Sequence, residues 1–110
     1  MSNLQTDNSE YNIKYILRQN LIKNGYNILD CFHGEGILYN NLKKEFDIKV
    51  VGIEKEKGKG FGIHGDNIKF LKKMDLSKYH IIDLDSYGIP FLQLEEIFNN
   101  KTLRNGTIII

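Results

Sequence analysis

Short apolar runs alternate with amphipathic stripes along most of this sequence, and this alternation constrains the fold more than any other feature. In the stripes, apolar residues recur three or four positions apart, as they do on one face of a helix. Strands that alternate with helices pair in parallel through right-handed crossovers. We therefore expect an α/β sandwich of three layers around a parallel sheet, in the spatial order second, first, fourth and fifth strand. These strands cover residues 49–53, 27–31, 79–84 and 107–110.

The N-terminal part of the chain combines a polar segment with a helical pattern. Residues 1–8 have too little apolar surface to order themselves, so we expect a disordered tail there. From Ser9, a suitable N-cap, apolar residues follow helical spacing, and Gly25 is suited to end the helix. The aromatic face of this helix, Tyr11 and Tyr15, packs either in the core or beside a ligand site.

The segment of residues 55–65 has four glycines and no helical periodicity. A parallel crossover normally needs a dozen or so residues, usually with a helix. The third strand, around residues 61–64, is therefore either vestigial or missing. Asp66 or Asn67 then suits the N-cap of a short helix over residues 68–73.

A glycine-containing loop follows the first expected strand. The strand ends in Asp30, and Gly34 and Gly36 follow two residues apart. Glycine adopts backbone angles closed to other residues and lets a ligand approach the backbone. In open α/β sheets, ligands bind outside the carboxyl ends of the strands. We therefore expect a ligand over this loop, with a helix beginning near Gly36.

A second acid, Glu54, stands at the end of the second expected strand, 20 residues beyond Gly34. In βαβ nucleotide sites, an acid at about this distance accepts hydrogen bonds from ribose hydroxyls. The alternative is a surface charge in a lysine-rich turn.

Taken together, residues 27–110 resemble the class I S-adenosylmethionine-dependent methyltransferases, which have a Rossmann-like fold. Residues 30–36 look like the first motif of that family, in the Phe-x-Gly-x-Gly form found in many enzymes that act on amino groups. Glu54 matches the acid that binds the ribose, and Asp66 matches the acid that contacts the adenine. The resemblance implies S-adenosyl-L-methionine as cofactor. The implied binding residues are Asp30, Phe32, Gly34, Glu35, Gly36, Glu54, Asp66 and Asn67.

Residues 83–88, Asp-Leu-Asp-Ser-Tyr-Gly, are similar to the fourth motif of the family. They resemble the Asp-Pro-Pro-Tyr of nucleic-acid amino methyltransferases and, more closely, the Asp-Leu-Asp-Pro-Tyr-Gly of tRNA guanine N2-dimethyltransferases. This implies methyl transfer to an exocyclic amine of a nucleobase in RNA or DNA. Asp85, Ser86 and Tyr87 are then the catalytic candidates, with Asp85 accepting the N–H bonds of the amine and Tyr87 stacking on the base.

The sequence also departs from the family. Ser86 replaces the proline of the fourth motif, the helix between the second and third strands is missing, and the last two of the seven family strands are absent. We therefore expect a truncated sheet, in residues 9–110 that form either one complete domain or a fragment of a longer domain. Two alternatives stay open: a non-catalytic binding or partner domain, and an NAD-dependent oxidoreductase. Tyr39 argues against the second, because the dinucleotide fingerprint has its third glycine there.

Charge and composition bear on partners and location. Residues 55–73 hold six lysines against Glu56 and Asp66, a local net charge of +4, whereas the whole chain has +1. Such a patch suits the phosphates of RNA or DNA, or is simply a solvated lysine face. The apolar C-terminal strand would leave an exposed edge, which predicts pairing with a second copy or a partner. Without a leader or a long apolar run, we expect a cytoplasmic protein that does not bind membranes. No metal-ligand spacing emerges from the three histidines and one cysteine.

Overall fold

The computed structural model of the chain describes residues 2–54, 63–64, 66–86 and 88–110. Its centre is one sheet of five parallel strands in the order β3-β2-β1-β4-β5. This confirms the parallel pairing and the order expected from the sequence. The strands are β1 (Asn27–Asp30), β2 (Lys49–Glu54), β3 (Ile63–His64), β4 (Ile81–Asp83) and β5 (Ile108–Ile109).

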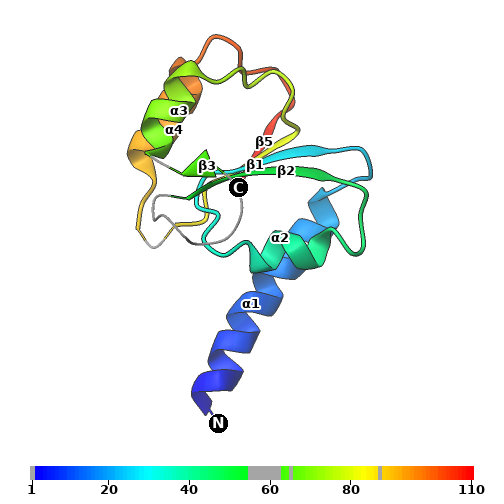
Figure 1. Cartoon of the computed structure of the whole chain (residues 1–110). Coiled ribbons are helices and arrows are strands. Elements are labelled where there is room, and N and C mark those ends of the chain that lie inside the picture. Colours follow the sequence, from blue (N-terminus) through cyan, green and yellow to red (C-terminus); the bar gives the residue numbers. More distant parts are fainter. Residues whose placement is uncertain (1, 55–62, 65, 87) are drawn as a thin grey trace.

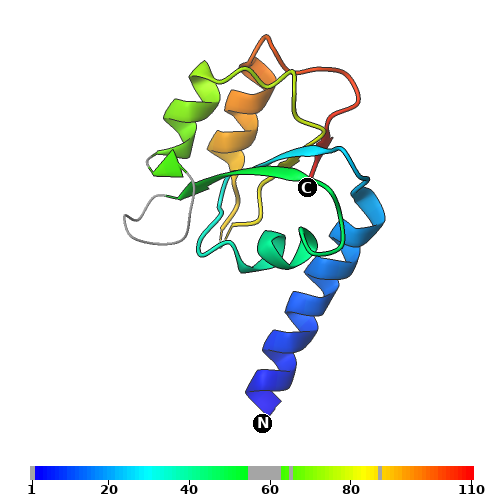
Figure 2. The ribbon, with the colours of Figure 1, turned by 45° about the vertical axis from the view of Figure 1, so that its right-hand side comes forward.

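Helices cover both faces of this sheet, which makes the predicted three layers (Figure 1). One face carries the first two helices, and the opposite face carries the other two, as the turned view also shows (Figure 2). They are α1 (Ser2–Leu21), α2 (Ile37–Leu42), α3 (Asn67–Lys73) and α4 (Phe91–Asn99).

Two hydrophobic clusters fill the spaces between the layers. Successive residues of a strand point to opposite faces of a sheet. Leu29 and Ile82 accordingly lie in the cluster that also contains Leu71 of α3 and Ile97 of α4. Their neighbours in sequence, Ile28 and Ile81, lie in the other cluster, with Tyr39 and Leu42 of α2. The near-continuous apolar character of the strands therefore reflects burial on both sides.

The first helix differs from its prediction at both ends. It begins at Ser2 rather than at Ser9, so it includes residues 2–8, which the sequence assigned to a disordered tail. Those residues contain neither glycine nor proline, so the backbone offers no stop to helix extension. The helix ends at Leu21, before Gly25, which has a positive φ of 91° in the turn that leads to β1. The N-terminal part of α1 projects away from the sheet (Figure 1).

The third strand is vestigial, one of the two outcomes expected. β3 has two residues, and it pairs with the carboxyl end of β2 through Ile53 with Ile63 and Glu54 with His64. Residues 55–62, the connection predicted to lack a helix, lie outside the described residues. In the part of the chain that the structure describes, no helix is both long enough and apolar enough to cross a membrane.

Candidate functional site

Acidic side chains end three neighbouring strands at the same edge of the sheet. Asp30 closes β1, Glu54 closes β2 and Asp83 closes β4. The register places Asp30 beside Asp83, and Asp85 follows two residues later. Because parallel strands share the direction of their carboxyl ends, the fold gathers these carboxylates where α/β sheets bind ligands.

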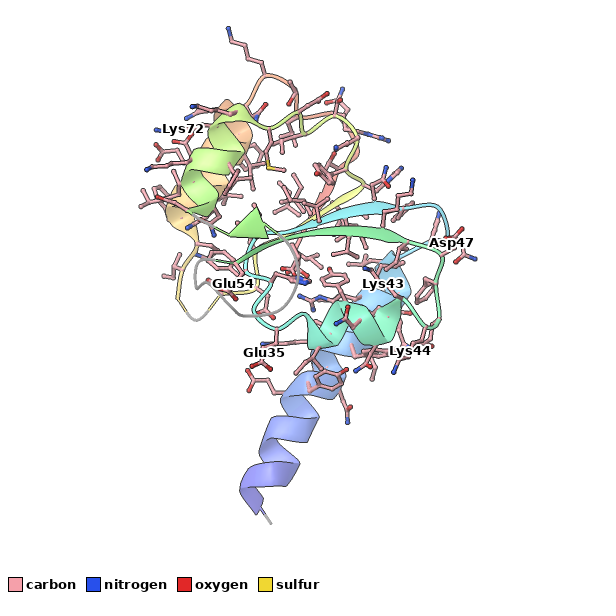
Figure 3. The ribbon with its side chains drawn as sticks, in the orientation of Figure 1. Glu35, Lys43, Lys44, Asp47, Glu54 and Lys72 are labelled. Carbon is pink, nitrogen blue, oxygen red and sulfur yellow. The ribbon has the colours of Figure 1, made fainter. Side chains whose placement is uncertain are left out.

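The glycine loop lies at this edge, between β1 and α2. Gly34 and Gly36 have φ angles of 58° and 76°, which glycine adopts without strain. Gly36 is the N-cap of α2, so the helix begins near Gly36 as predicted. A Cβ built on Gly34 would lie 3.7 Å from Oε2 of Glu54. The loop and the acid at the end of β2 are therefore neighbours. Glu35 is exposed, and it lies on the same side of the molecule as Glu54 (Figure 3).

Gly36 and Gly52 make room for a side chain of the protein itself, the ring of His33. A Cβ on Gly36 would lie 2.5 Å from Nε2 of that ring, and a Cβ on Gly52 would lie 2.2 Å from its Cγ. Real Cβ atoms do not approach other atoms so closely, so both positions need glycine while the ring is there. The sequence interpretation assigned Gly36 to a ligand, whereas in the structure its missing side chain accommodates His33.

Asp30 is largely engaged within the protein. Its Oδ2 lies 3.0 Å from Nδ1 of His33, and its Oδ1 accepts the N–H of Phe32 at 3.3 Å. Burial raises the pKa of Asp30 above its ordinary value, and the nearby Asp83 acts in the same direction, against the hydrogen bond from His33. Asp30 thus fixes the orientation of the His33 ring.

Asp83 accepts hydrogen bonds on both carboxylate oxygens, and it is 1% exposed. The Arg18 guanidinium of α1 donates from Nε to Oδ2 at 2.8 Å and from Nη2 to Oδ1 at 3.0 Å. Tyr39 of α2 donates its hydroxyl to Oδ2 at 2.6 Å. The backbone N–H of Asp85 donates to Oδ1 at 3.0 Å. This cluster, Arg18, Tyr39 and Asp83, joins both helices of one layer to the end of β4.

The surroundings of Arg18 and Tyr39 keep the guanidinium charged and the phenol neutral. Burial acts to lower the pKa of Arg18, but the hydrogen bonds and charge of Asp83 outweigh it, so the pKa lies above its ordinary value. Burial and the negative charge of Asp83 raise the pKa of the Tyr39 phenol. Arg18 and Asp83 therefore form a buried ion pair, with Tyr39 as a neutral donor.

Asp85, the predicted acceptor for a substrate amine, forms an ion pair in the structure. Its Oδ2 lies 3.1 Å from Nζ of Lys14 and 3.8 Å from Nη2 of Arg18, both on α1. The Ser86 hydroxyl donates to the backbone oxygen of Gly88 at 2.6 Å. Ser86 occupies the position where the motif that this segment resembles has a proline. Tyr87, the predicted stacking residue, lies outside the described residues.

The two residues at the start of α3 have structural contacts. Asp66 is the N-cap, and its Oδ1 accepts the N–H of Ile68 at 2.9 Å, which confirms the predicted cap. Asn67 donates to the backbone oxygen of Cys31 at 2.9 Å and accepts from Gln93 of α4 at 3.0 Å. These bonds hold the start of α3 against the end of β1.

Three other aromatic residues considered for the site have contacts within the protein. Phe32 is half-buried and packs against the cluster beneath α3 and α4. Tyr11 and Tyr15 stack at 5.9 Å between ring centroids and face α2, where the Tyr11 hydroxyl accepts from Asn41 at 2.7 Å. Tyr15 donates to Glu45, and this hydrogen bond raises its pKa to about 12. The aromatic face of α1 thus fixes α1 on α2.

Sequence reasoning missed Arg18, His33, Lys14 and the role of Asp83. One signal was available in the sequence. Asp83 is the one charged residue in the otherwise apolar stretch of residues 81–84, and a buried carboxylate requires a partner. The sequence did not reveal this partner, because the spacing of apolar residues in α1 predicts a different buried face from the one that the structure has. The polar Lys14 and Arg18 of α1 face the protein, whereas Ile13, Ile16 and Leu17 are exposed.

The geometry defines a class: a parallel α/β domain with a glycine loop and carboxylates at the carboxyl edge of its sheet. No family model matches the sequence, and no curated protein matches it either. A crystal structure of a SAM-dependent methyltransferase from Geobacter sulfurreducens, in complex with S-adenosyl-L-homocysteine, is similar in fold, with a TM-score of 0.64 at 16% sequence identity. The match covers 92% of this chain and 46% of that chain. The chain thus shares the fold of that methyltransferase and spans less than half of its length.

Proposed function

We propose that the chain binds S-adenosyl-L-methionine over Gly34, with Glu54 on the ribose hydroxyls. The observation that carries this proposal is the 3.7 Å approach between the position of a Gly34 Cβ and Oε2 of Glu54. A nucleoside held against the loop backbone would meet that carboxylate, which offers two acceptor oxygens. The shared fold with a methyltransferase that was crystallised with S-adenosyl-L-homocysteine supports the same ligand.

We further propose that the reaction is methyl transfer to an exocyclic amine of a nucleobase in RNA or DNA. When bound, the cofactor supplies an electrophilic methyl group on a sulfonium, whose leaving group is neutral. Little acid or base power is then required, and positioning contributes most of the rate. Asp85 follows β4 at the cofactor edge. Lys14 and Arg18 lie 3.1 Å and 3.8 Å from its Oδ2. A carboxylate has two acceptor oxygens, and we propose that Oδ1 accepts an N–H of the amine.

Replacing Glu54 with alanine should weaken the binding of S-adenosyl-L-methionine about tenfold or more. Losing a charged acceptor costs about 1.5 to 3 kcal/mol. Isothermal titration calorimetry measures the change, and Asp47→Ala, which removes a carboxylate at the distant end of the molecule, is the matched control (Figure 3). Equal affinities for wild type and Glu54→Ala would remove Glu54 from the site. Titration with NAD in parallel tests the oxidoreductase alternative, which predicts binding of NAD instead.

Replacing Asp85 with alanine, which removes both acceptor oxygens, should reduce methyl transfer by about a hundredfold, the scale of misplacing a reacting group. The assay follows transfer of a labelled methyl group to mixed structured RNA and to DNA. Unchanged cofactor affinity of the variant would show that the cofactor site is intact. Transfer at the wild-type rate would contradict the assignment of Asp85.

A second candidate, a cofactor-binding domain without transfer activity, is favoured by one observation. Lys14 already places a cation on the Asp85 carboxylate at 3.1 Å, where the substrate amine is proposed to bind. Ser86, which replaces the proline of the resembled motif, also favours a domain without transfer activity. The two candidates differ in the assay above, because this one predicts cofactor binding with no transfer to RNA or DNA.

A further inference from the structure

We propose that a pocket along α3 binds a nucleotide of single-stranded nucleic acid next to the target base. This extends the proposed function, because it adds to the nucleic-acid substrate a second binding site outside the carboxyl edge. The pocket has a volume of about 490 Å³ and is lined by Asp66, Lys69, Phe70, Lys73 and Met74. This volume is in the range of pockets that hold small ligands.

The wall of the pocket is apolar. Phe70 and Met74 are half-buried and pack with their other sides against the cluster beneath α3 and α4. Each is therefore held in place by the core while part of it stays accessible. An aromatic ring and a thioether are suitable surfaces for the flat face of a nucleobase, because stacking on aromatic side chains does not depend on the base.

The rim of the pocket is positively charged. Lys69 and Lys73 are exposed and four residues apart, so their ammonium groups lie on the same side of the helix. Neither forms an ion pair with another residue that the structure describes. Lys72, by contrast, lies 3.9 Å from Glu96 of α4. Like charges at this spacing disfavour the helix, and a bound phosphate would relieve their repulsion.

The pocket shares one residue, Asp66, with the predicted cofactor-binding residues. Asp66 lines it and also caps α3 at the carboxyl edge of the sheet. From there α3 runs to Met74 over a rise of about 12 Å, which is long enough for more than one nucleotide. The bond from Asn67 to Cys31 fixes this end of the pocket to the loop after β1. A strand could therefore lie along α3 with its next base at the site.

The combination of features favours nucleic acid over other anions. Two cations alone would suit any acidic chain, and an apolar wall alone would suit any hydrophobic side chain. Each nucleotide of a single strand has a phosphate, which suits the lysines, and a base, which can stack on the apolar wall. The pocket is also open to the surface, as an extended strand requires.

The test is the binding of fluorescein-labelled single-stranded RNA of about 12 nucleotides, without cofactor, by fluorescence anisotropy. Wild type is compared with the double variant Lys69→Ala/Lys73→Ala. The matched control, called the α2 variant, is Lys43→Ala/Lys44→Ala, which removes the same charge from two exposed lysines just after α2, in the other helical layer (Figure 3). All four lysines are exposed, so both variants should fold.

We expect the α3 variant to bind about tenfold more weakly at low salt and the α2 variant to bind like wild type. The slope of log affinity against log salt should also become less steep by about 1.4, since each phosphate contact to a single strand contributes about 0.7. A labelled strand of the same length made of abasic units should bind wild type more weakly than the RNA, because it has no bases for the Phe70 wall.

Several results would overturn the proposal. Equal losses in the two variants would mean that only net charge matters, and equal binding of RNA and abasic strand would exclude a base in the pocket. No binding of RNA by wild type at low salt would exclude the site altogether. Loss of S-adenosyl-L-methionine binding in the α3 variant would assign the pocket to the cofactor. A wild type that binds RNA but no cofactor would leave the pocket standing and remove the proposed function.

Discussion

Replacing Arg18 with methionine should lower the free energy of unfolding by about 3 to 5 kcal/mol, the range found when one partner of a buried ion pair is removed. Methionine has a similar volume, so the expected loss comes from charge rather than from a cavity. Asp83 would keep its bonds from Tyr39 and Asp85 but would lose its ion pair with Arg18. The total free energy of unfolding of a native domain is about 5 to 15 kcal/mol, so the variant should be marginally stable.

Urea unfolding followed by circular dichroism measures this change. Lys23→Met removes a charge from an exposed residue just after α1, and it should change stability by less than about 0.5 kcal/mol. Adding Asp83→Asn to Arg18→Met should recover about 1 kcal/mol or more, because it removes the unpaired charge. If Arg18→Met is as stable as wild type, the ion pair does not stabilise the fold.

Replacing Gly52 with alanine should destabilise the wild type by about 1 to 3 kcal/mol, the usual cost of forcing an extra methyl group into a packed interior. The new Cβ would lie 2.2 Å from Cγ of His33, and Gly52 lies in the middle of the sheet. The ring would have to leave its place beside Asp30 and Gly36. The same substitution in a His33→Ala background should be neutral or stabilising by about 0.4 to 1 kcal/mol.

A double-mutant cycle from thermal and urea unfolding of the four proteins measures the coupling of Gly52 with His33. The reversal of sign is the decisive feature, since a general intolerance of alanine in β2 would give the same loss in both backgrounds. If the effects of the two substitutions on the free energy of unfolding are additive, the ring of His33 does not lie against Gly52.

Several features of the fold could be predicted from the sequence because they depend on local periodicity. The alternation of apolar runs and stripes predicted the parallel strands, their order and the three layers. The N-cap Asp66 and the start of α2 after Gly36 were also predicted, because caps depend on few neighbouring residues. The start of α1 was not, because polar composition alone does not stop a helix that lacks a breaker.

The sequence also predicted that Asp30, Glu54 and Asp85 lie at one edge, since each of them ends or follows an expected strand. Asp83 was not among them, because the expected strand ran on to residue 84. The sequence did not predict what each side chain contacts there. The spacing of apolar residues predicted that α1 is a helix, but not that Lys14 and Arg18 face the sheet while Ile13 and Leu17 face outward. That orientation depends on Asp83, 65 residues further along the chain than Arg18. A buried carboxylate must find its cation wherever the chain brings one close, and only the tertiary structure decides which residue that is.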